Sequence, residues 1–513
     1  MNTRFTLRDR ACGLLLHPTS LPGRHGSGDL GPGAHHYVDF LADAGQRWWQ
    51  MLPTGPPGAG NSPYSSSSAL AGSPLLISLD KLVDDGLLSA ADTRPVRGLQ
   101  SERVCYGAVT RYRLARLLRA FRVFVREGGS KQPEYQRFLR KQRCWLEDYA
   151  LFAALKQRYG GQAWIEWPRN RRLLKRAEAA LVKRELNREI DFQRFIQFKY
   201  HQQWTALRDY AHKRGVGLIG DMPIFVALDS SDVWAHRRLF DLYANGRPKV
   251  VSGVPPDLFT RDGQLWGHPH YCWPRHRATH FAWWLSRFTR AFEQFDAVRI
   301  DHFLGFHRCW AVPGQALTAR HGRWVLTPGK EMFEIMRRKM GRLEIIAEDL
   351  GVVTKEALAL RDRLRFPGMR LLQFAFGDDE GARYHQPQQY PQCSVVYTGT
   401  HDNDTTLGWF QGVKAAARKW KGSGISEYDR LTRYLDRRSG PFNWHLIRLA
   451  YQSVARTAII PMQDVLDLDK SGRMNRPGTP LGNWEWRMSS GSLSVIRAAR
   501  LRGLAHAYER LVV

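Results

Sequence analysis

Cysteine is scarce and scattered in this chain of 513 residues. The six cysteines stand at positions 12, 105, 144, 272, 309 and 393, and no two of them form a C-x-x-C pair. The pattern therefore indicates neither a zinc site nor a disulfide framework. It suits a protein that folds in a reducing cytosol.

Long apolar runs are also missing. No stretch approaches 18 uncharged apolar residues, so no transmembrane helix is expected. The early apolar run at 11–16 is too short for the hydrophobic part of a signal peptide, and no convincing cleavage site follows it. We therefore expect a cytoplasmic protein with no membrane partner.

Several motifs of common enzyme classes do not occur where they would be needed. No G-x-G-x-x-G motif or P-loop stands directly after a predicted strand, which argues against a dinucleotide or nucleoside triphosphate site of those types. No G-x-S-x-G elbow is present, which argues against a serine hydrolase.

Acidic residues are few relative to basic ones. The 77 Lys and Arg residues exceed the 48 Asp and Glu residues, which gives a net charge of +29. Such a charge first suggests a nucleic-acid partner. More than half of the excess lies in 101–220, where segments such as 111–126 alternate basic and apolar residues at helical spacing. This spacing is typical of solvated helix faces, and no nucleic-acid module is recognised, so we do not expect a nucleic-acid partner.

Eight short apolar runs recur along the chain, and most close on Gly, Pro, Asp or His. They lie at 12–17, 48–52, 216–219, 297–303, 343–347, 370–374, 394–397 and 457–460. Helix-like segments separate most of them, at 33–44, 196–214, 280–295, 329–340 and 354–364. Short apolar strands that alternate with helices predict a parallel sheet. Eight such units predict the α/β class and a (β/α)8 TIM barrel.

The spacing of these runs is uneven, which predicts insertions into the barrel. About 160 residues separate the second run from the third, far more than the dozen or so of a normal crossover. We expect barrel strands 1 and 2 in 1–81, a helical insertion in 82–212 and strand 3 in 213–228. A loop-rich insertion is expected in 229–271, and strands 4 to 8 with a C-terminal helix in 272–513.

Carboxylates stand just past four predicted strands. They are Asp221, Asp301, Glu348 and Asp402, and Asp349 directly follows Glu348. Barrel enzymes keep their active sites at the carboxyl ends of the strands. Cleavage of a glycosidic bond uses such a set, with one carboxylate at the anomeric centre and another that protonates the leaving oxygen. Sequence alone does not say whether Glu348 or Asp349 faces the cleft.

Arg299 lies two residues before Asp301, so both side chains point to the same side of a strand. The guanidinium can hold the carboxylate ionised and oriented, as a nucleophile requires. A purely structural ion pair is the alternative.

Asp, Glu and His also bind Mg²⁺ or Mn²⁺, but no compact spacing of metal ligands is present, so neither a metal nor a cofactor is expected.

Motifs in matching order along nearly the whole chain resemble the 4-α-glucanotransferases (amylomaltases, or disproportionating enzymes) of glycoside hydrolase family 77. They are GLLLHPTSLPG at 13–23, NSPYSS at 61–66, GDMPIFV at 220–226, VSGVPPDLFTRDGQLWG at 251–267, VRIDHF at 298–303, AEDLG at 347–351, GTHDND at 399–404 and RMNRPGTPLGNWEWR at 473–487. One departure is Leu304, where we expect Arg in many relatives.

The resemblance implies a role for each candidate residue. Asp301 is expected as the nucleophile, Glu348 as the general acid and base, and Asp402 as the third acid, which holds ring hydroxyls of the sugar. Arg299 would orient Asp301. The expected substrate-binding residues are Tyr64, Asp221, Trp266, Arg299, His302, His401 and Asn483. Core packing is the alternative for Tyr64, loop capping for Asp221 and a structural role for the histidines. Asn483 and Trp484 could line the cleft or brace the closure of the barrel.

Loop 251–267 resembles a lid over the acceptor side of such a cleft, with Trp266 at its end. The implied activity is transfer of an α-1,4-glucan segment to another glucan or to glucose, with retention and without a cofactor. The expected partners are α-1,4-glucans, maltooligosaccharides and glucose, and the oligomeric state is left open. An amylase-like hydrolase is the alternative enzyme. A basic scaffold that binds RNA or glycogen through 101–220 is the alternative outside enzymes, and it leaves the strand-end acids unexplained.

Overall fold

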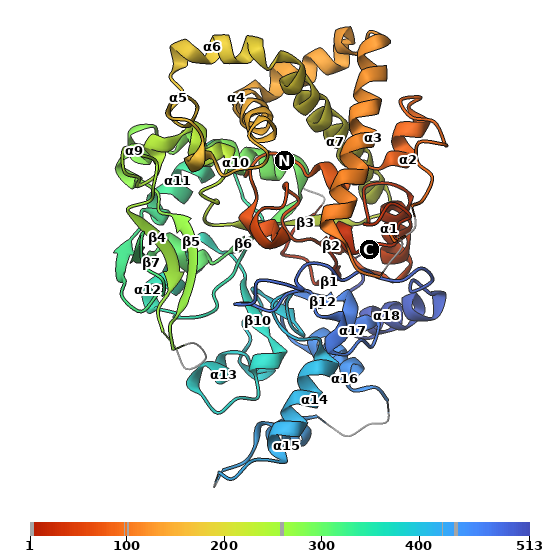
Figure 1. Ribbon diagram of the computed structural model, residues 1–513. Coiled ribbons are helices and arrows are strands. Elements are labelled where there is room, and N and C mark those ends of the chain that lie inside the picture. The colour runs from red at the N-terminus through yellow and green to blue at the C-terminus, as the bar shows by residue number, and fades with distance from the viewer. Residues whose placement is uncertain are drawn as a thin grey trace.

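A closed barrel of eight parallel strands forms the centre of the protein (Figure 1). The computed structural model describes residues 5–96, 98–99, 102–256, 261–422, 424–435 and 440–512. Around the barrel the strands follow the order β1-β12-β11-β10-β9-β6-β3-β2. They are β1 (Ala11–Leu15), β2 (Trp48–Gln50), β3 (Gly217–Pro223), β6 (Ala297–Asp301), β9 (Ile345–Ala347), β10 (Gly368–Leu371), β11 (Ser394–Tyr397) and β12 (Thr457–Pro461). The predicted TIM barrel is confirmed, and each predicted apolar run overlaps one strand.

The barrel strands are short and apolar, and both of their faces are buried. Strands β1, β10, β11 and β12 have no exposed residue, as expected for strands packed between a barrel interior and an outer layer of helices. Gly13 shows how tight this packing is, since a Cβ atom there would lie 2.4 Å from the carbonyl oxygen of Trp48. Trp48 and Trp49 are both fully buried beside it.

Helices after the strands cover the outside of the barrel. The outer layer and the carboxyl-terminal half contain α1 (Pro32–Asp43), α10 (Ala282–Gln294), α11 (Gly329–Met340), α12 (Lys355–Leu364), α13 (Glu380–Tyr384), α14 (Thr406–Ala417), α15 (Glu427–Tyr434), α16 (Phe442–Gln452), α17 (Met462–Val465) and α18 (Val495–Ala507). Helix α12 shows how local interactions set the ends of a helix. At its start the Thr354 hydroxyl accepts a hydrogen bond from the Ala357 amide, and at its end Arg365 adopts the left-handed conformation.

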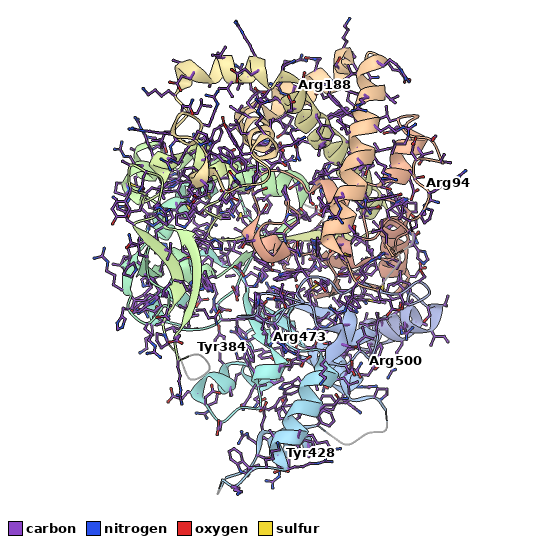
Figure 2. The ribbon with its side chains drawn as sticks, viewed as in Figure 1. Arg94, Arg188, Tyr384, Tyr428, Arg473 and Arg500 are labelled. Atoms are coloured by element: carbon purple, nitrogen blue, oxygen red, sulfur yellow. The ribbon has the colours of Figure 1, made fainter. Side chains whose placement is uncertain are left out.

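The segment between β2 and β3 is mainly helical, in agreement with the predicted insertion. It contains α2 (Leu79–Asp84), α3 (Tyr106–Arg126), α4 (Pro133–Arg158), α5 (Arg169–Arg172), α6 (Arg176–Glu185) and α7 (Asn187–Lys213). These helices form the upper part of the molecule in Figure 1. Phe124 packs against Phe195 and Phe198 inside the insertion, whereas Arg188 lies at its exposed end (Figure 2). The apolar and basic faces follow the helical spacing in the sequence except at Arg113 of α3, which is fully buried and pairs with Asp29.

The segment 229–271, predicted to be loop-rich, contains more regular structure than expected. It holds α8 (Ser231–Ala235) and two strands of a second sheet with the order β5-β4-β7-β8. The two strands within the segment are β4 (Val250–Val254) and β5 (Gln264–Pro269), and α9 (Trp273–Ala278) follows β5. The other two strands of the sheet, β7 (Arg308–Pro313) and β8 (Arg323–Leu326), come after β6. The sheet therefore joins the loop after β3 to the loop after β6. Sequence could not show this, because antiparallel pairing between distant segments depends on the barrel that brings them together.

No helix in the described ranges is both long enough and apolar enough to cross a membrane.

Candidate active site

Arg299 is the centre of a cluster of carboxylates at the carboxyl end of the barrel. Its Nη1 donates to Oδ2 of Asp221 at 2.6 Å, and its Nη2 donates to Oδ1 of Asp301 at 3.2 Å. The same Nη2 lies 3.5 Å from Oε2 of Glu348. The Arg299 side chain is only 3% exposed. Burial opposes a charged guanidinium, but Asp221, Glu348 and Asp301 hold the pKa of Arg299 well above its ordinary value.

Strand register brings these residues together. Asp221 on β3 stands opposite Arg299 on β6, and Arg299 stands opposite Ile346 on β9, two residues before Glu348. Parallel strands present their carboxyl ends at one rim. Residues distant in the chain therefore meet around one guanidinium.

Glu348 and Asp349 point in different directions, which answers the question that the sequence leaves open. Glu348 lines the cleft. Asp349 is 1% exposed and accepts hydrogen bonds from the Tyr384 hydroxyl at 2.6 Å and the Met369 amide at 2.8 Å, as well as from Arg361. Asp349 is thus held in the packing behind the rim, and Glu348 is the carboxyl group available to a ligand.

The turn after β6 aims a backbone donor at Glu348. His302 has φ 51° and ψ 51°, a left-handed conformation that is uncommon outside glycine. From this position the His302 amide donates to Oε2 of Glu348. The Phe303 amide, at the start of η8 (Phe303–Phe306), donates to the Glu348 carbonyl at 3.0 Å. A backbone residue held in a sparsely populated conformation is often found at a functional site.

The electrostatics of the cluster favour a protonated Glu348. Burial raises the pKa of Glu348 to about 8, and the charges of Asp301 and Asp402 act in the same direction, while Arg299 and the His302 amide oppose it. The Asp301 side chain is more open, at 29% exposed. Two carboxyl groups side by side in different environments are suited to opposite roles, one as a proton donor and one as a nucleophile.

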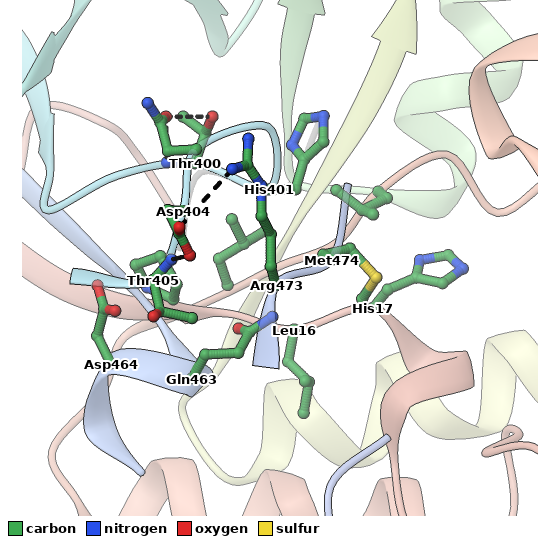
Figure 3. Close-up of a pocket in the computed structure, with 14 residues that line it drawn as sticks. Leu16, His17, Thr400, His401, Asp404, Thr405, Gln463, Asp464, Arg473 and Met474 are labelled. Atoms are coloured by element: carbon green, nitrogen blue, oxygen red, sulfur yellow. Dashed lines mark hydrogen bonds and ion pairs between the residues drawn. The ribbon is translucent and has the colours of Figure 1, made fainter. Parts of the chain in front are cut away.

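Asp402 stands at the rim after β11. Its Oδ1 accepts from the Asn475 amide group at 2.6 Å and lies 3.4 Å from Nε2 of His401. Arg473 donates to the Asp402 carbonyl at 2.8 Å. Figure 3 shows Arg473 reaching toward Asp404 beside His401, at a small pocket of about 20 Å³ below the rim. The last sequence motif therefore braces the loop that carries Asp402.

Tyr64 joins two parts of the site. Its hydroxyl donates to Oδ2 of Asp221 at 2.7 Å. Its ring stacks on His401 at 5.1 Å between centroids and 15° between planes, and Trp484 lies 5.7 Å away. The three rings form an aromatic cluster at the cleft, in which Trp484 is tilted by 43° from Tyr64, and an aromatic ring of this kind can pack against the face of a sugar.

A cleft of about 690 Å³ opens over the cluster. Its lining includes seven residues expected from the sequence, namely Tyr64, Trp266, Asp301, His302, Glu348, His401 and Asp402. Asp221 and Arg299 do not line it and lie beneath its floor. Trp266 meets His302 edge to face at 4.9 Å. Burial lowers the pKa of His302 to about 4, which leaves a neutral ring that can both donate and accept at neutral pH.

Several further polar or aromatic residues line the cleft without being expected from the sequence, and four of them, outside loop 251–267, carry an imidazole, guanidinium, indole or amide group that could bind a sugar. These four are His268, Arg308, Trp324 and Asn475. The Arg308 guanidinium lies 4.2 Å from the Trp324 ring centroid. Three of the four belong to the second sheet, whose pairing the sequence does not reveal. Asn475 stands within the 473–487 motif, which could have indicated it.

The side chain of Asn483 forms its hydrogen bonds within its own loop. Its amide nitrogen donates to Thr479, and its oxygen accepts from the Arg476 amide at 2.8 Å. It is absent from the cleft lining, whereas Trp484 is present. These contacts favour the bracing alternative for Asn483.

The lid expected at 251–267 is only partly visible. Residues 257–260 lie outside the described residues. On either side, Val254, Pro255, Gln264 and Trp266 line the cleft, so the flanks of this loop border the site. Within the described ranges, no group of three or more His, Cys, Asp and Glu side chains is arranged to hold a metal ion.

Comparison with known proteins assigns the family. A family model described as 4-alpha-glucanotransferase matches residues 16–494. The chain belongs to this family of 4-α-glucanotransferases. The 4-alpha-glucanotransferase of Thermus thermophilus is 46% identical over 98% of this chain and 99% of its own. That of Synechocystis sp. is 42% identical over 99% of both chains.

Solved structures agree with this family. Amylomaltase from Streptococcus agalactiae, solved in complex with acarbose, matches with a TM-score of 0.92 and 36% identity. The match covers 98% of this chain and 99% of that chain. As a 4-α-glucanotransferase, the protein is a glycosyl-transferring enzyme that acts on α-glucans.

Proposed function

We propose that this 4-α-glucanotransferase cuts an α-1,4-glucan with retention and passes the segment to the 4-hydroxyl of another glucan or of glucose. The observation that carries the proposal is the shared contact of Arg299 Nη2 with Asp301 and Glu348, at 3.2 and 3.5 Å. One nitrogen this close to both carboxyl groups keeps them near each other, as a retaining mechanism needs.

Asp301 acts as the nucleophile in the first half of the reaction. Its carboxylate attacks the anomeric carbon while the bond from that carbon to the leaving oxygen breaks, and Glu348 gives its proton to that oxygen. In the second half, Glu348 takes the proton of the acceptor 4-hydroxyl. That oxygen then bonds to the anomeric carbon and releases Asp301. Arg299 orients the Asp301 carboxylate for its attack and receives it again when the second half releases it.

The remaining residues hold the sugar. Asp402, next to Asn475, accepts from ring hydroxyls, and His302 and His401 hydrogen-bond hydroxyls at the same ring. Tyr64 packs beneath a glucose, and Trp266 covers the acceptor side. Asp221 lies beneath the cleft floor and acts on the sugar site through its hydrogen bonds with Tyr64 and Arg299. Asn483 supports the sugar site indirectly, through the hydrogen bonds that hold its own loop together.

Transfer rather than hydrolysis requires that the acceptor is well placed and that water is not. The flanks of loop 251–267 and the second sheet border the cleft on one side and restrict access of water to the glucosyl-enzyme. The amylomaltase of Streptococcus agalactiae is described as a complex with acarbose, which supports an oligosaccharide ligand in the corresponding cleft here. The reaction needs no cofactor or metal, takes place in the cytoplasm and involves no nucleic acid.

The product profile from maltotriose tests the proposal. A ladder of longer and shorter oligosaccharides together with glucose is expected. Accumulation of maltose and glucose alone would mean hydrolysis by an amylase-like enzyme and would contradict the proposal.

A further inference from the structure

A second large cavity, of about 660 Å³, lies at the amino-terminal end of the barrel, opposite the glucan cleft. Its lining comes from the segments that lead into five strands, β1, β9, β10, β11 and β12, which are consecutive around the barrel. These segments contribute Leu7 and Arg8, Arg342 to Glu344, Phe366 and Pro367, Pro391 and Cys393, and Arg456. Helices α11 and α12 close its side.

The lining is rich in arginine. Six guanidinium groups border the cavity, from Arg8, Arg337, Arg342, Arg361, Arg365 and Arg456, against two carboxylates, Glu344 and Asp362. Both carboxylates already have partners: Glu344 lies 2.7 Å from Nε of Arg342, and Asp362 lies 2.7 Å from Nη2 of Arg361. The cavity therefore carries an excess of positive charge after internal pairing.

Four of these arginines have no acidic partner among the residues that the structure describes. Arg8, Arg337, Arg365 and Arg456 form no ion pair with any residue in the described part of the chain. Arg8, Arg337 and Arg365 are exposed and Arg456 is half-buried, so all four can reorient toward a ligand. Like charges around one cavity repel each other, and a bound anion would relieve that repulsion.

The floor of the cavity is apolar. Leu7, Phe333, Leu343, Ile345 and Phe366 line it, and each is at most 7% exposed. A site with an apolar floor and convergent charged groups is typical of small-molecule pockets, and the volume falls within their usual range of about 300–1,000 Å³.

We propose that this cavity binds a small molecule that carries two or more linked phosphate groups. Guanidinium groups bind phosphate oxygens in bidentate fashion, and four unpaired guanidiniums match a ligand with several negative charges better than one with a single charge. The same chemistry is present in inorganic polyphosphate and in nucleoside polyphosphates. A nucleoside would add contacts between its base and the apolar floor.

The cavity does not share a lining residue with the glucan cleft. Its ligand should therefore bind without competing with the sugar. This proposal does not depend on the catalytic roles given above.

Calorimetric titration of the full-length protein with tripolyphosphate and, separately, with ATP tests the proposal in metal-free buffer. Saturable binding of tripolyphosphate is expected, with inorganic phosphate weaker by tenfold or more. Arg337→Gln combined with Arg456→Gln should weaken tripolyphosphate binding at least tenfold. Arg338→Gln is the matched control, because Arg338 is the next residue of the same helix, is exposed and does not line the cavity. It should leave binding within twofold.

The arms of the titration separate the two sources of the ligand. Equal binding of ATP and tripolyphosphate would indicate an inorganic chain, and tighter binding of ATP would indicate a nucleoside polyphosphate. Absence of binding by both, or equal loss in Arg338→Gln and in the double variant, would overturn the proposal. Binding that maltotriose displaces would also overturn it, because the ligand would then occupy the glucan cleft.

Cys393 offers a second readout that does not depend on the arginine variants. It is exposed and lines the cavity, whereas the other exposed cysteines, Cys105 and Cys144, do not line it. In a Cys105→Ser, Cys144→Ser background, tripolyphosphate should slow alkylation of Cys393 at least fivefold. An unchanged rate at a saturating concentration would contradict the assigned location.

Discussion

Arg299 and Asp221 form a buried ion pair beneath the cleft, with 2.6 Å between Nη1 and Oδ2. The two residues stand opposite each other on β6 and β3, and their side chains are 3% and 0% exposed. The pair fixes the guanidinium whose other nitrogen contacts Asp301 and Glu348. Asp221 therefore supports the two carboxyl groups of the proposed reaction through Arg299.

Asp221→Asn should lower both stability and turnover. The substitution removes the carboxylate that lies nearest to the buried Arg299 guanidinium, and a loss of about 3 kcal/mol in the free energy of unfolding is expected. Thermal melting and the rate of maltotriose disproportionation measure the two effects. The control is Glu331→Gln, which breaks the exposed ion pair with Arg277 and should cost about 0–1 kcal/mol. Equal melting temperatures for the two variants would show that the buried pair does not support the site.

Asp301→Asn should reduce kcat by about 10³-fold or more, since the variant cannot form the covalent intermediate. The measurement is glucose release from maltotriose, with circular dichroism to verify folding. Asp378→Asn changes an exposed carboxylate outside the cleft and should retain full activity. Appreciable transfer by Asp301→Asn would place the nucleophile elsewhere.

Activity should fall on the alkaline side as Glu348 loses its proton. The acid form is needed to protonate the leaving oxygen, and burial raises the pKa of Glu348 to about 8. The pH profile of kcat/KM for maltotriose should therefore decline through about pH 8. A profile that stays flat to pH 9.5 would argue against Glu348 as the proton donor.

Glu348→Gln should stabilise the folded protein while it abolishes transfer. The raised pKa means that the folded state binds this proton more tightly than the unfolded state does. Ionisation of Glu348 therefore lowers stability as pH rises from its unfolded pKa near 4.5 to its folded pKa of about 8. The melting temperature of the variant should exceed that of the parent at pH 8, and the difference should shrink toward pH 5. A difference independent of pH would contradict this account.

Trp266→Ala should shift the reaction from transfer toward hydrolysis. Trp266 lines the cleft and packs edge to face on His302, so its loss opens the acceptor side to water. The ratio of reducing ends formed to glucan transferred should rise severalfold, and the KM for a glucose acceptor should increase. Trp266→Phe keeps an aromatic ring and should lie between the parent and the alanine variant.

The sequence by itself determined the barrel, because eight short apolar runs with polar ends can be buried only as parallel strands covered by helices. It also determined that Asp301, Glu348 and Asp402 stand at strand ends, and the family motifs separated Glu348 from Asp349. Tertiary structure supplied the physical reason for that separation. Arg361, Tyr384 and the Met369 amide hold Asp349 away from the cleft, and these partners lie 12 to 35 residues further along the chain.

Only the tertiary structure placed Arg308 and Trp324 at the cleft. Strand β7, which carries Arg308, pairs with β4 from the loop after β3, and β8, which carries Trp324, pairs with β7. No local sequence pattern predicts the pairing of β4 with β7. The same holds for the arginine-lined cavity at the other end of the barrel. Arg8 and Arg456 are far apart in the chain, and they line one cavity because β1 and β12 are neighbours in the closed barrel. Local sequence fixes which residue ends a strand, and closure of the barrel decides which ends meet.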